Sequence, residues 1–125
     1  MSRILIVEDH ADIRRLIRMT LEFAGHEGEI VEACDGAAGL ALACSFKPDV
    51  VLTDVMMPGG PNGVELCRAL KADPRTQGAA VVVITARGQA VDRRAALEAG
   101  AGAYLVKPFS PLELIQTLED LGVAA

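Results

Sequence analysis

Five residues with chemically active side chains stand at the ends of four short apolar runs. Glu8 and Asp9 follow the first run, Asp54 follows "VVLT", Thr85 closes "AVVVIT", and Lys107 follows "AYLV". Charged side chains are rarely buried without a partner, so a carboxylate at the end of a buried run indicates a loop cap or a functional site. Three carboxylates about 5 Å apart would repel by roughly 3 kcal/mol per pair at an effective dielectric of about 20. Lys107 supplies one compensating charge, and an all-oxygen set of this kind suits Mg²⁺.

The apolar runs themselves predict five strands, over residues 3–8, 29–33, 49–53, 80–85 and 103–106. Several runs are almost continuously apolar, which is typical of parallel strands that are covered on both faces. The segments between them have the spacing of amphipathic helices. In residues 10–25 the apolar positions fall on one stripe, formed by Ile13, Leu16, Ile17, Leu21 and Ala24.

Helix starts are marked by capping residues. Asp35 and Asn62 are expected to begin the second and third helices, and Ser110 with Glu113 forms a capping box before the last one. The fourth helix, between Gly88 and Gly100, has only Val91 and Leu97 as large apolar residues, so it is expected to bury little. Phe23 and Phe46 are expected to pack in the core or at its rim.

Strand and helix alternate five times, which predicts an α/β fold with a parallel sheet and right-handed crossovers. No linker, repeat or low-complexity tract interrupts the chain, so residues 1–125 are expected to form one domain. Ligands of open α/β sheets bind outside the carboxyl ends of the strands. Glu8, Asp9, Asp54, Thr85 and Lys107 are therefore expected to face one crevice.

Composition limits the classes of function. Hydrophobic residues make up 51% and charged residues 23% of the 125 residues, as in a globular protein. The net charge of −5 argues against direct nucleic-acid binding, and no apolar run approaches the roughly 20 residues of a membrane span. The three cysteines form no CxxC pair and suit reduced thiols, so a cytoplasmic location is expected.

The chain resembles the receiver domain of bacterial two-component response regulators over essentially its full length. The resemblance is carried by "VED" (residues 7–9), "DVMMPG" (54–59), "ITA" (84–86) and "YLVKPF" (104–109), in this order and at these separations. It implies a flavodoxin-like doubly wound (βα)5 fold with the strand order 2-1-3-4-5. It also implies that an aspartate accepts a phosphoryl group from a phosphohistidine.

Carried over by position, the resemblance makes Asp54 the phosphoacceptor. Glu8, Asp9, Asp54 and the backbone carbonyl of Met56 would hold Mg²⁺, with Asp9 as a direct ligand and Glu8 acting mainly through water. Thr85 and Lys107 would contact the phosphoryl oxygens, Thr85 and Tyr104 would form the switch, and the Lys107–Pro108 bond would be cis. Such a domain is not an enzyme in the usual sense, because it catalyses only its own phosphorylation and slow dephosphorylation.

The implied partners are a histidine kinase or histidine phosphotransfer protein and a downstream target or effector domain. The chain is expected to be a monomer or weak dimer. Docking is expected around the acceptor, on His10, Ala11, Ile13, Arg14, Pro108 and Phe109, while His10 is expected to have no catalytic role. The position of Met1, two residues before the first expected strand, favours a natural start. A natural single-domain regulator and a receiver taken from a larger regulator or hybrid kinase both stay open.

The residues also argue against three other classes of protein. An aspartyl-phosphate phosphatase of the haloacid dehalogenase type would carry a second acid two residues after the nucleophile, where this chain has Met56. A flavin carrier on the same fold would need an uncharged phosphate loop after the first strand, where this chain has "EDHAD". A receiver that is never phosphorylated and serves in dimerisation would not need the complete acceptor set.

Overall fold

The computed structural model describes residues 3–55, 57, 60–86 and 92–122. In chain order the elements are β1 (Ile4–Val7), α1 (Ala11–Phe23), β2 (Ile30–Ala33), α2 (Gly36–Phe46), β3 (Val50–Asp54), α3 (Gly63–Ala72), β4 (Ala80–Ala86), α4 (Asp92–Glu98), β5 (Ala103–Lys107) and α5 (Pro111–Asp120). Every strand and helix expected from the sequence is therefore present. The strand boundaries differ by one or two residues, which is the usual uncertainty of element ends.

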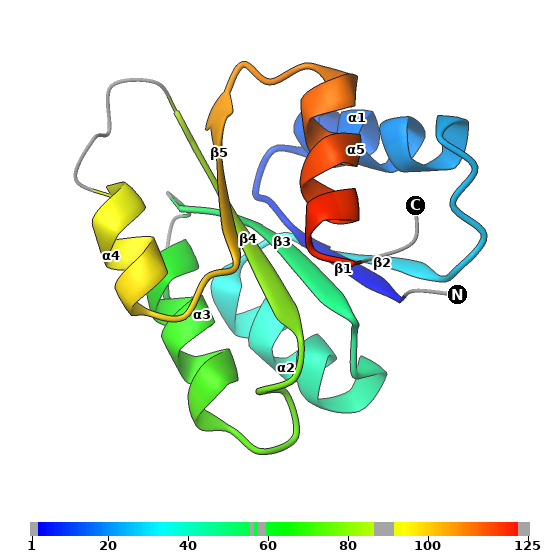
Figure 1. Cartoon of the computed structure of the whole chain (residues 1–125). Coiled ribbons are helices and arrows are strands. Elements are labelled where there is room, and N and C mark those ends of the chain that lie inside the picture. The colour runs from blue at the N-terminus through cyan, green and yellow to red at the C-terminus, as the bar shows by residue number, and fades with distance from the viewer. Residues whose placement is uncertain (1–2, 56, 58–59, 87–91, 123–125) are drawn as a thin grey trace.

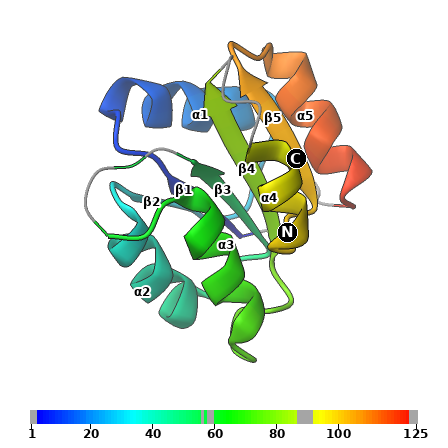
Figure 2. The same cartoon turned by 90° about the vertical axis from the view of Figure 1, so that its left-hand side faces the viewer.

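All strand pairs are parallel, and the sheet order is β2-β1-β3-β4-β5. This is the flavodoxin-like order that the resemblance implies. Helices α1 and α5 cover one face of the sheet, and α2, α3 and α4 cover the other (Figure 1, Figure 2). The register pairs Asp54 with Ile84 and Ala86 with Lys107. The carboxyl ends of β3, β4 and β5 therefore meet at one edge of the sheet.

The core lies in two layers because successive strand residues point to opposite faces. Leu5 and Val7 of β1 belong to the layer under α2, α3 and α4, whereas Ile4 and Ile6 belong to the layer under α1 and α5. All four side chains are completely buried. This two-sided burial explains why the strands read as continuous apolar runs.

The predicted caps are confirmed. The Asp35 side chain accepts a hydrogen bond from the Ala38 amide at the start of α2. Asn62 with Glu65 and Ser110 with Glu113 form capping boxes at the starts of α3 and α5. These side chains satisfy backbone amides that have no partner within the helix, and they fix where each helix begins.

Three expectations about packing are wrong. Phe23 is 95% exposed at the end of α1, and Leu16 is also exposed, because α1 meets the sheet through Ile17 and Leu21. Leu97 is 49% exposed and does not anchor α4. Two small residues are buried instead, Ala96 of α4 and Ala99 directly after it, and Val91 lies outside the described residues. A helix that lies close to its neighbours can pack through alanines, so large apolar side chains are not needed to hold it in place.

The first residue of α3 must be glycine for steric reasons. A Cβ atom on Gly63 would collide with the backbone carbonyl of Asp54, which leaves no side chain to move aside. We expect Gly63→Ala to lower the free energy of unfolding by roughly 1–3 kcal/mol, as overpacking does. Urea denaturation measures this change. Gly78→Ala is the matched control because nothing lies within 4 Å of its added Cβ, and an equal loss in both variants would contradict the steric account.

Candidate functional site

Lys107 bridges two buried carboxylates at the carboxyl edge of the sheet. Its Nζ donates hydrogen bonds to Glu8 Oε2 at 3.0 Å and to Asp54 Oδ2 at 3.2 Å. Glu8 is 1% exposed and Asp54 is 6% exposed. The three residues come from the ends of β1, β3 and β5, which the parallel register brings together. The juxtaposition predicted from the sequence for these residues is therefore confirmed.

The charges of Glu8, Asp54 and Lys107 influence the pKa values of Asp54 and Lys107. Burial raises the pKa of Asp54, the nearby Glu8 carboxylate raises it further, and Lys107 opposes both effects. Burial by itself would lower the pKa of Lys107, but its hydrogen bond to Glu8 and the charge of Asp54 together raise it. The ammonium therefore stays protonated at neutral pH and compensates two carboxylates at once.

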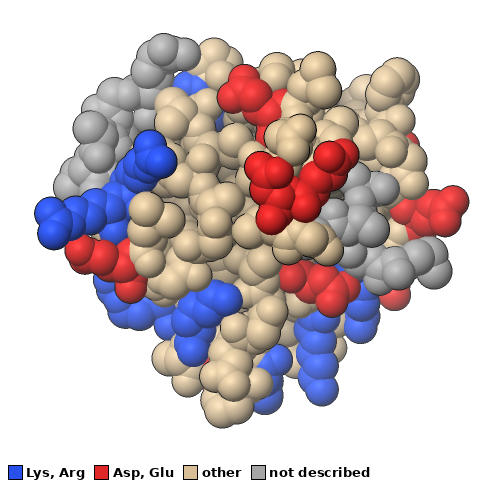
Figure 3. Space-filling view, in the orientation of Figure 1, with Lys and Arg blue, Asp and Glu red and all other residues tan. Residues whose placement is uncertain are grey.

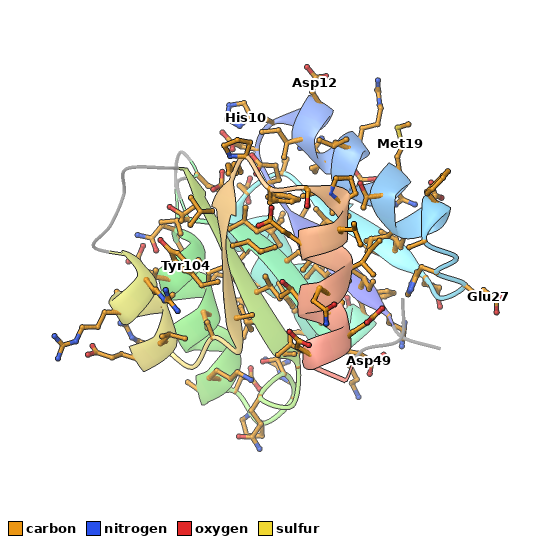
Figure 4. The ribbon with its side chains drawn as sticks, turned by 45° about the horizontal axis from the view of Figure 1, so that its top comes forward. His10, Asp12, Met19, Glu27, Asp49 and Tyr104 are labelled. Carbon is orange, nitrogen blue, oxygen red and sulfur yellow. The ribbon has the colours of Figure 1, made fainter. Side chains whose placement is uncertain are left out.

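Asp9 and His10 complete the group on the solvent side. His10 Nδ1 lies 2.9 Å from Glu8 Oε1, and the His10 amide donates to the same oxygen at 3.2 Å. The hydrogen bond to Glu8 and the charge of Asp9 raise the pKa of His10. Sequence reasoning placed His10 on the docking surface around the acceptor but did not predict its contact with Glu8. Its position directly after the acidic pair was the available signal (Figure 4).

An oxygen atom of Asp9 is left without a hydrogen bond. Oδ1 is buried and has no hydrogen-bond partner among the described residues, although it lies 3.1 Å from His10 Nδ1. One ligand atom each from Glu8, Asp9, His10 and Asp54 fall within 4.8 Å of one another. A buried carboxylate oxygen with no donor, in a cluster of carboxylates, fits a hard divalent cation. The expected Met56 carbonyl lies outside the described residues.

The two expected switch residues lie on neighbouring strands. Thr85 of β4 is completely buried, and its Cα partner on β5 is Val106. Tyr104 is partly buried and packs against the core layer that contains Ala96 of α4 and Ala99, the residue after the helix. Figure 4 shows it on the side of β5 that faces α4. The tyrosine ring is therefore in a position where a shift of α4 would change its surroundings.

Arg14 of α1 makes hydrogen bonds that support the site. Its Nη1 donates to the Glu8 carbonyl at 2.6 Å, and its Nε donates to Glu32 Oε1 of β2 at 3.2 Å. Arg18 Nε donates to the other oxygen of Glu32 at 2.6 Å. The docking role expected for Arg14 stays a prediction. Its guanidinium is nevertheless mostly buried and fixes the backbone of Glu8, a role that the sequence did not indicate.

The peptide bond between Lys107 and Pro108 is cis, as the resemblance implies.

Comparison with known proteins decides the family. The family model of the response regulator receiver domain matches residues 4–119. The chain belongs to this family. Receiver domains are the signalling domains of two-component response regulators, so this membership decides against the haloacid dehalogenase and flavin-carrier alternatives.

The curated relatives of this receiver domain are longer response regulators. The phosphate regulon transcriptional regulatory protein PhoB of Pseudomonas aeruginosa is 42% identical over 116 residues, which cover 93% of this chain and 49% of the relative. The DNA-binding dual master transcriptional regulator RpaA of Synechocystis is 37% identical, over 97% of this chain and 49% of the relative. The receiver domain thus spans about half the length of the curated relatives it matches.

Solved structures agree with the fold. A putative response regulator from Chloroflexus aurantiacus has a TM-score of 0.88 at 32% identity, with 96% of both chains covered. The chemotaxis response regulator CheY4 of Vibrio cholerae has a TM-score of 0.86 at 31% identity, with 97% of this chain and 98% of that chain covered.

None of the helices in the described part of the chain combines the length and the apolar composition of a membrane span.

The contacts of Arg14 predict a difference between two adjacent arginines. Arg14→Ala removes charge-assisted hydrogen bonds to Glu8 and Glu32, and we expect the free energy of unfolding to fall by roughly 1–3 kcal/mol. Arg15→Ala is the matched control, because Arg15 is exposed and makes no ion pair within the described ranges. Its change should stay within about 0.5 kcal/mol. Urea denaturation of both variants checks this, and equal stabilities would contradict a structural role for Arg14.

Proposed function

We propose that residues 1–125 act as one Mg²⁺-dependent phosphoacceptor domain, in which Asp54 takes a phosphoryl group from the phosphohistidine of a histidine kinase or histidine phosphotransfer protein. The observation that carries this proposal is the hydrogen bond from Lys107 to Asp54 at the carboxyl edge of the sheet. A carboxylate at this position is a nucleophile held by a rigid strand and paired with a cation that can follow the incoming charge.

The transfer needs positioning and charge compensation more than covalent chemistry. A carboxylate oxygen of Asp54 bonds to phosphorus, and the phosphorus–nitrogen bond breaks with its electron pair left on the imidazole of the donor. β3 holds the Asp54 carboxylate in place before the donor arrives, which removes an entropic barrier. Lys107 lies close enough to Asp54 to contact the oxygens of the transferred group, whose charge it stabilises.

The acidic cluster supports a Mg²⁺ site at the same place. Asp9, Asp54, Glu8 and the carbonyl of Met56 would hold the ion, with Asp9 as a direct ligand and Glu8 acting mainly through water. When bound, Mg²⁺ would neutralise negative charge on the phosphoryl group. The Asp9 oxygen that accepts no hydrogen bond supports the direct role, and the two hydrogen bonds that Lys107 and His10 make to Glu8 support the indirect one.

Phosphorylation would switch the surface formed by α4, β5 and α5. The Thr85 hydroxyl would bond the phosphoryl group better in the active state, and its movement would open space for the Tyr104 ring. The partial burial of Tyr104 against the layer that holds α4 supports this coupling. On this face, Figure 3 shows basic side chains beside acidic ones over α4, and acidic side chains over α5. A downstream partner would recognise this distribution of charge.

The output of the switch would be a downstream target or an effector domain, rather than direct contact with nucleic acid. PhoB and RpaA are named as transcriptional regulators, and this chain spans about half of each. We propose the same kind of coupling here, in the cytoplasm and without a membrane contact. A receiver that acts without phosphorylation is the second candidate, which the experiment on Asp54 tests.

Asp54 is expected to be the only phosphorylated residue. With Mg²⁺ and acetyl phosphate, the parent should gain one phosphoryl group by intact mass, and Asp54→Ala should gain none. Asp49→Ala is the matched control, because Asp49 is an exposed aspartate next to the opposite end of β3 (Figure 4). Equal phosphorylation of the Asp54→Ala protein would overturn the assignment, and no phosphorylation of the folded parent would favour the non-phosphorylated alternative.

The two acids of the pair are expected to differ in metal binding. Asp9→Ala should weaken Mg²⁺ binding and slow phosphorylation by acetyl phosphate much more than Glu8→Gln, because only Asp9 would be a direct ligand. Isothermal titration with Mg²⁺ measures the first effect, and the rate of mass gain measures the second. Unchanged Mg²⁺ titration of the Asp9→Ala protein would contradict this division of roles.

Thr85 is expected to couple the phosphorylation of Asp54 to a structural change around Tyr104. In NMR spectra, the phosphoryl mimic beryllofluoride should shift resonances from the acceptor to Tyr104 and α4 in the parent. Thr85→Ala should still bind the mimic but lose the distant shifts. If those shifts persist in Thr85→Ala, the coupling does not pass through the threonine hydroxyl.

A further inference from the structure

The first residue of α2 packs against the chain that follows Asp54. This chain is the β3–α3 loop, residues 55–62, of which the structure describes 55, 57 and 60–62. Gly36 is buried, and a Cβ atom added to it would collide with the backbone carbonyl oxygen of Pro61. The same atom would lie 2.9 Å from Pro61 Cγ. Because the nearest obstacle is backbone, only glycine allows the loop to approach α2 this closely.

The start of α2 is itself held firmly. The Asp35 side chain accepts a hydrogen bond from the Ala38 amide at 2.7 Å, and the Asp35 carbonyl accepts one from the Gly39 amide at 3.0 Å. Helices α2 and α3 contact each other on the same face of the sheet (Figure 2). Pro61 therefore rests on a capped helix start, and its position is fixed from outside the loop.

Pro61 directly precedes the two residues that close the loop. Asn62 begins α3 through its capping box with Glu65. The Gly63 amide donates to the Val55 carbonyl at 2.9 Å, which joins the two ends of the loop. A displacement of Pro61 is therefore passed directly to the end of the loop that lies beside β3.

We propose that Gly36 is a positioning residue for the Mg²⁺ site, because it gives Pro61 room to rest on α2 and so fixes the path of the β3–α3 loop. The inference rests on the proposed function, in which the Met56 carbonyl of this loop helps to hold the ion. Gly36 would touch neither the ion nor the phosphoryl group. Asp54 belongs to β3 and does not depend on this contact, so the seat acts on metal affinity more than on the nucleophile.

Gly36→Ala separates positioning from stability. Under conditions where circular dichroism shows the variant to be folded, isothermal titration should give a Mg²⁺ dissociation constant roughly tenfold above that of the parent, as for other residues that orient a metal ligand. With acetyl phosphate, the Mg²⁺ concentration that gives half the maximal rate of mass gain should rise by the same factor. The maximal rate itself should fall by less than about twofold, because the nucleophile stays in place.

Gly102→Ala is the control for a tight contact elsewhere. Gly102 precedes β5 at the opposite edge of the sheet, and its added Cβ would lie 3.0 Å from the end of the Leu121 side chain. Its Mg²⁺ dissociation constant should stay within about twofold of the parental value.

A second pair of variants tests the loop side and does not require Gly36→Ala to fold. Gly60 and Gly122 have left-handed φ angles of 77° and 78°, and neither has an atom closer than 3.9 Å to an added Cβ. Alanine therefore strains the backbone similarly at both positions, but only Gly60 lies next to Pro61. Gly60→Ala should raise the Mg²⁺ dissociation constant several-fold, and Gly122→Ala should not change it.

The outcomes separate this inference from the proposed function. Mg²⁺ binding that is unchanged in Gly36→Ala or in Gly60→Ala overturns the inference, and so does an equal loss in the matched control. A lower maximal rate with unchanged Mg²⁺ half-saturation also overturns it, because the effect would then lie on Asp54. A parent that binds no Mg²⁺ overturns the proposed function as well. A parent that binds Mg²⁺ and accepts the phosphoryl group leaves that function standing, whatever the variants show.

Discussion

The ammonium of Lys107 is the interaction on which the site depends. Glu8 and Asp54 are nearly inaccessible to solvent, and two buried carboxylates this close together require a cation to remain charged. The lysine reaches both at hydrogen-bond distance from the end of β5. The parallel register makes this possible, because it aligns the carboxyl ends of β1, β3 and β5 at one edge. The sheet thus holds the charges of Glu8, Asp54 and Lys107 close together.

The helices fix this edge without closing it. Arg14 of α1 donates to the Glu8 carbonyl, and α3 begins with Gly63 against the Asp54 carbonyl, so the backbone of each acid is held by a neighbouring helix. Asp9 and His10 remain on the solvent side, where a metal ion and a donor can approach. Rigid support behind an open face is the arrangement that phosphoryl transfer requires, since positioning and electrostatics supply most of its catalysis.

The sequence was sufficient to predict the order of strands and helices, because hydrophobic periodicity and helix capping are local signals. It also located Glu8, Asp54 and Lys107 together, because parallel strands must end at a common edge. Side-chain contacts between elements away from this edge could not be predicted. The Arg14–Glu32 pair joins α1 to β2, and nothing in either segment alone indicates it. The exposure of Phe23 was missed for a related reason: an aromatic residue next to an amphipathic stripe reads as core until the helix is placed on the sheet.

A double-mutant cycle between Lys107 and Glu8 tests the central claim most directly. In EDTA at pH 7, Lys107→Met should lower the free energy of unfolding by roughly 1–3 kcal/mol, because it leaves two buried carboxylates without a counter-charge. In a Glu8→Gln background the same substitution should be less destabilising, by at least about 0.5 kcal/mol, because one of those carboxylates is gone. Urea denaturation of the four proteins gives this coupling. Equal losses in both backgrounds, or a Lys107→Met protein more stable than the parent, would contradict the account.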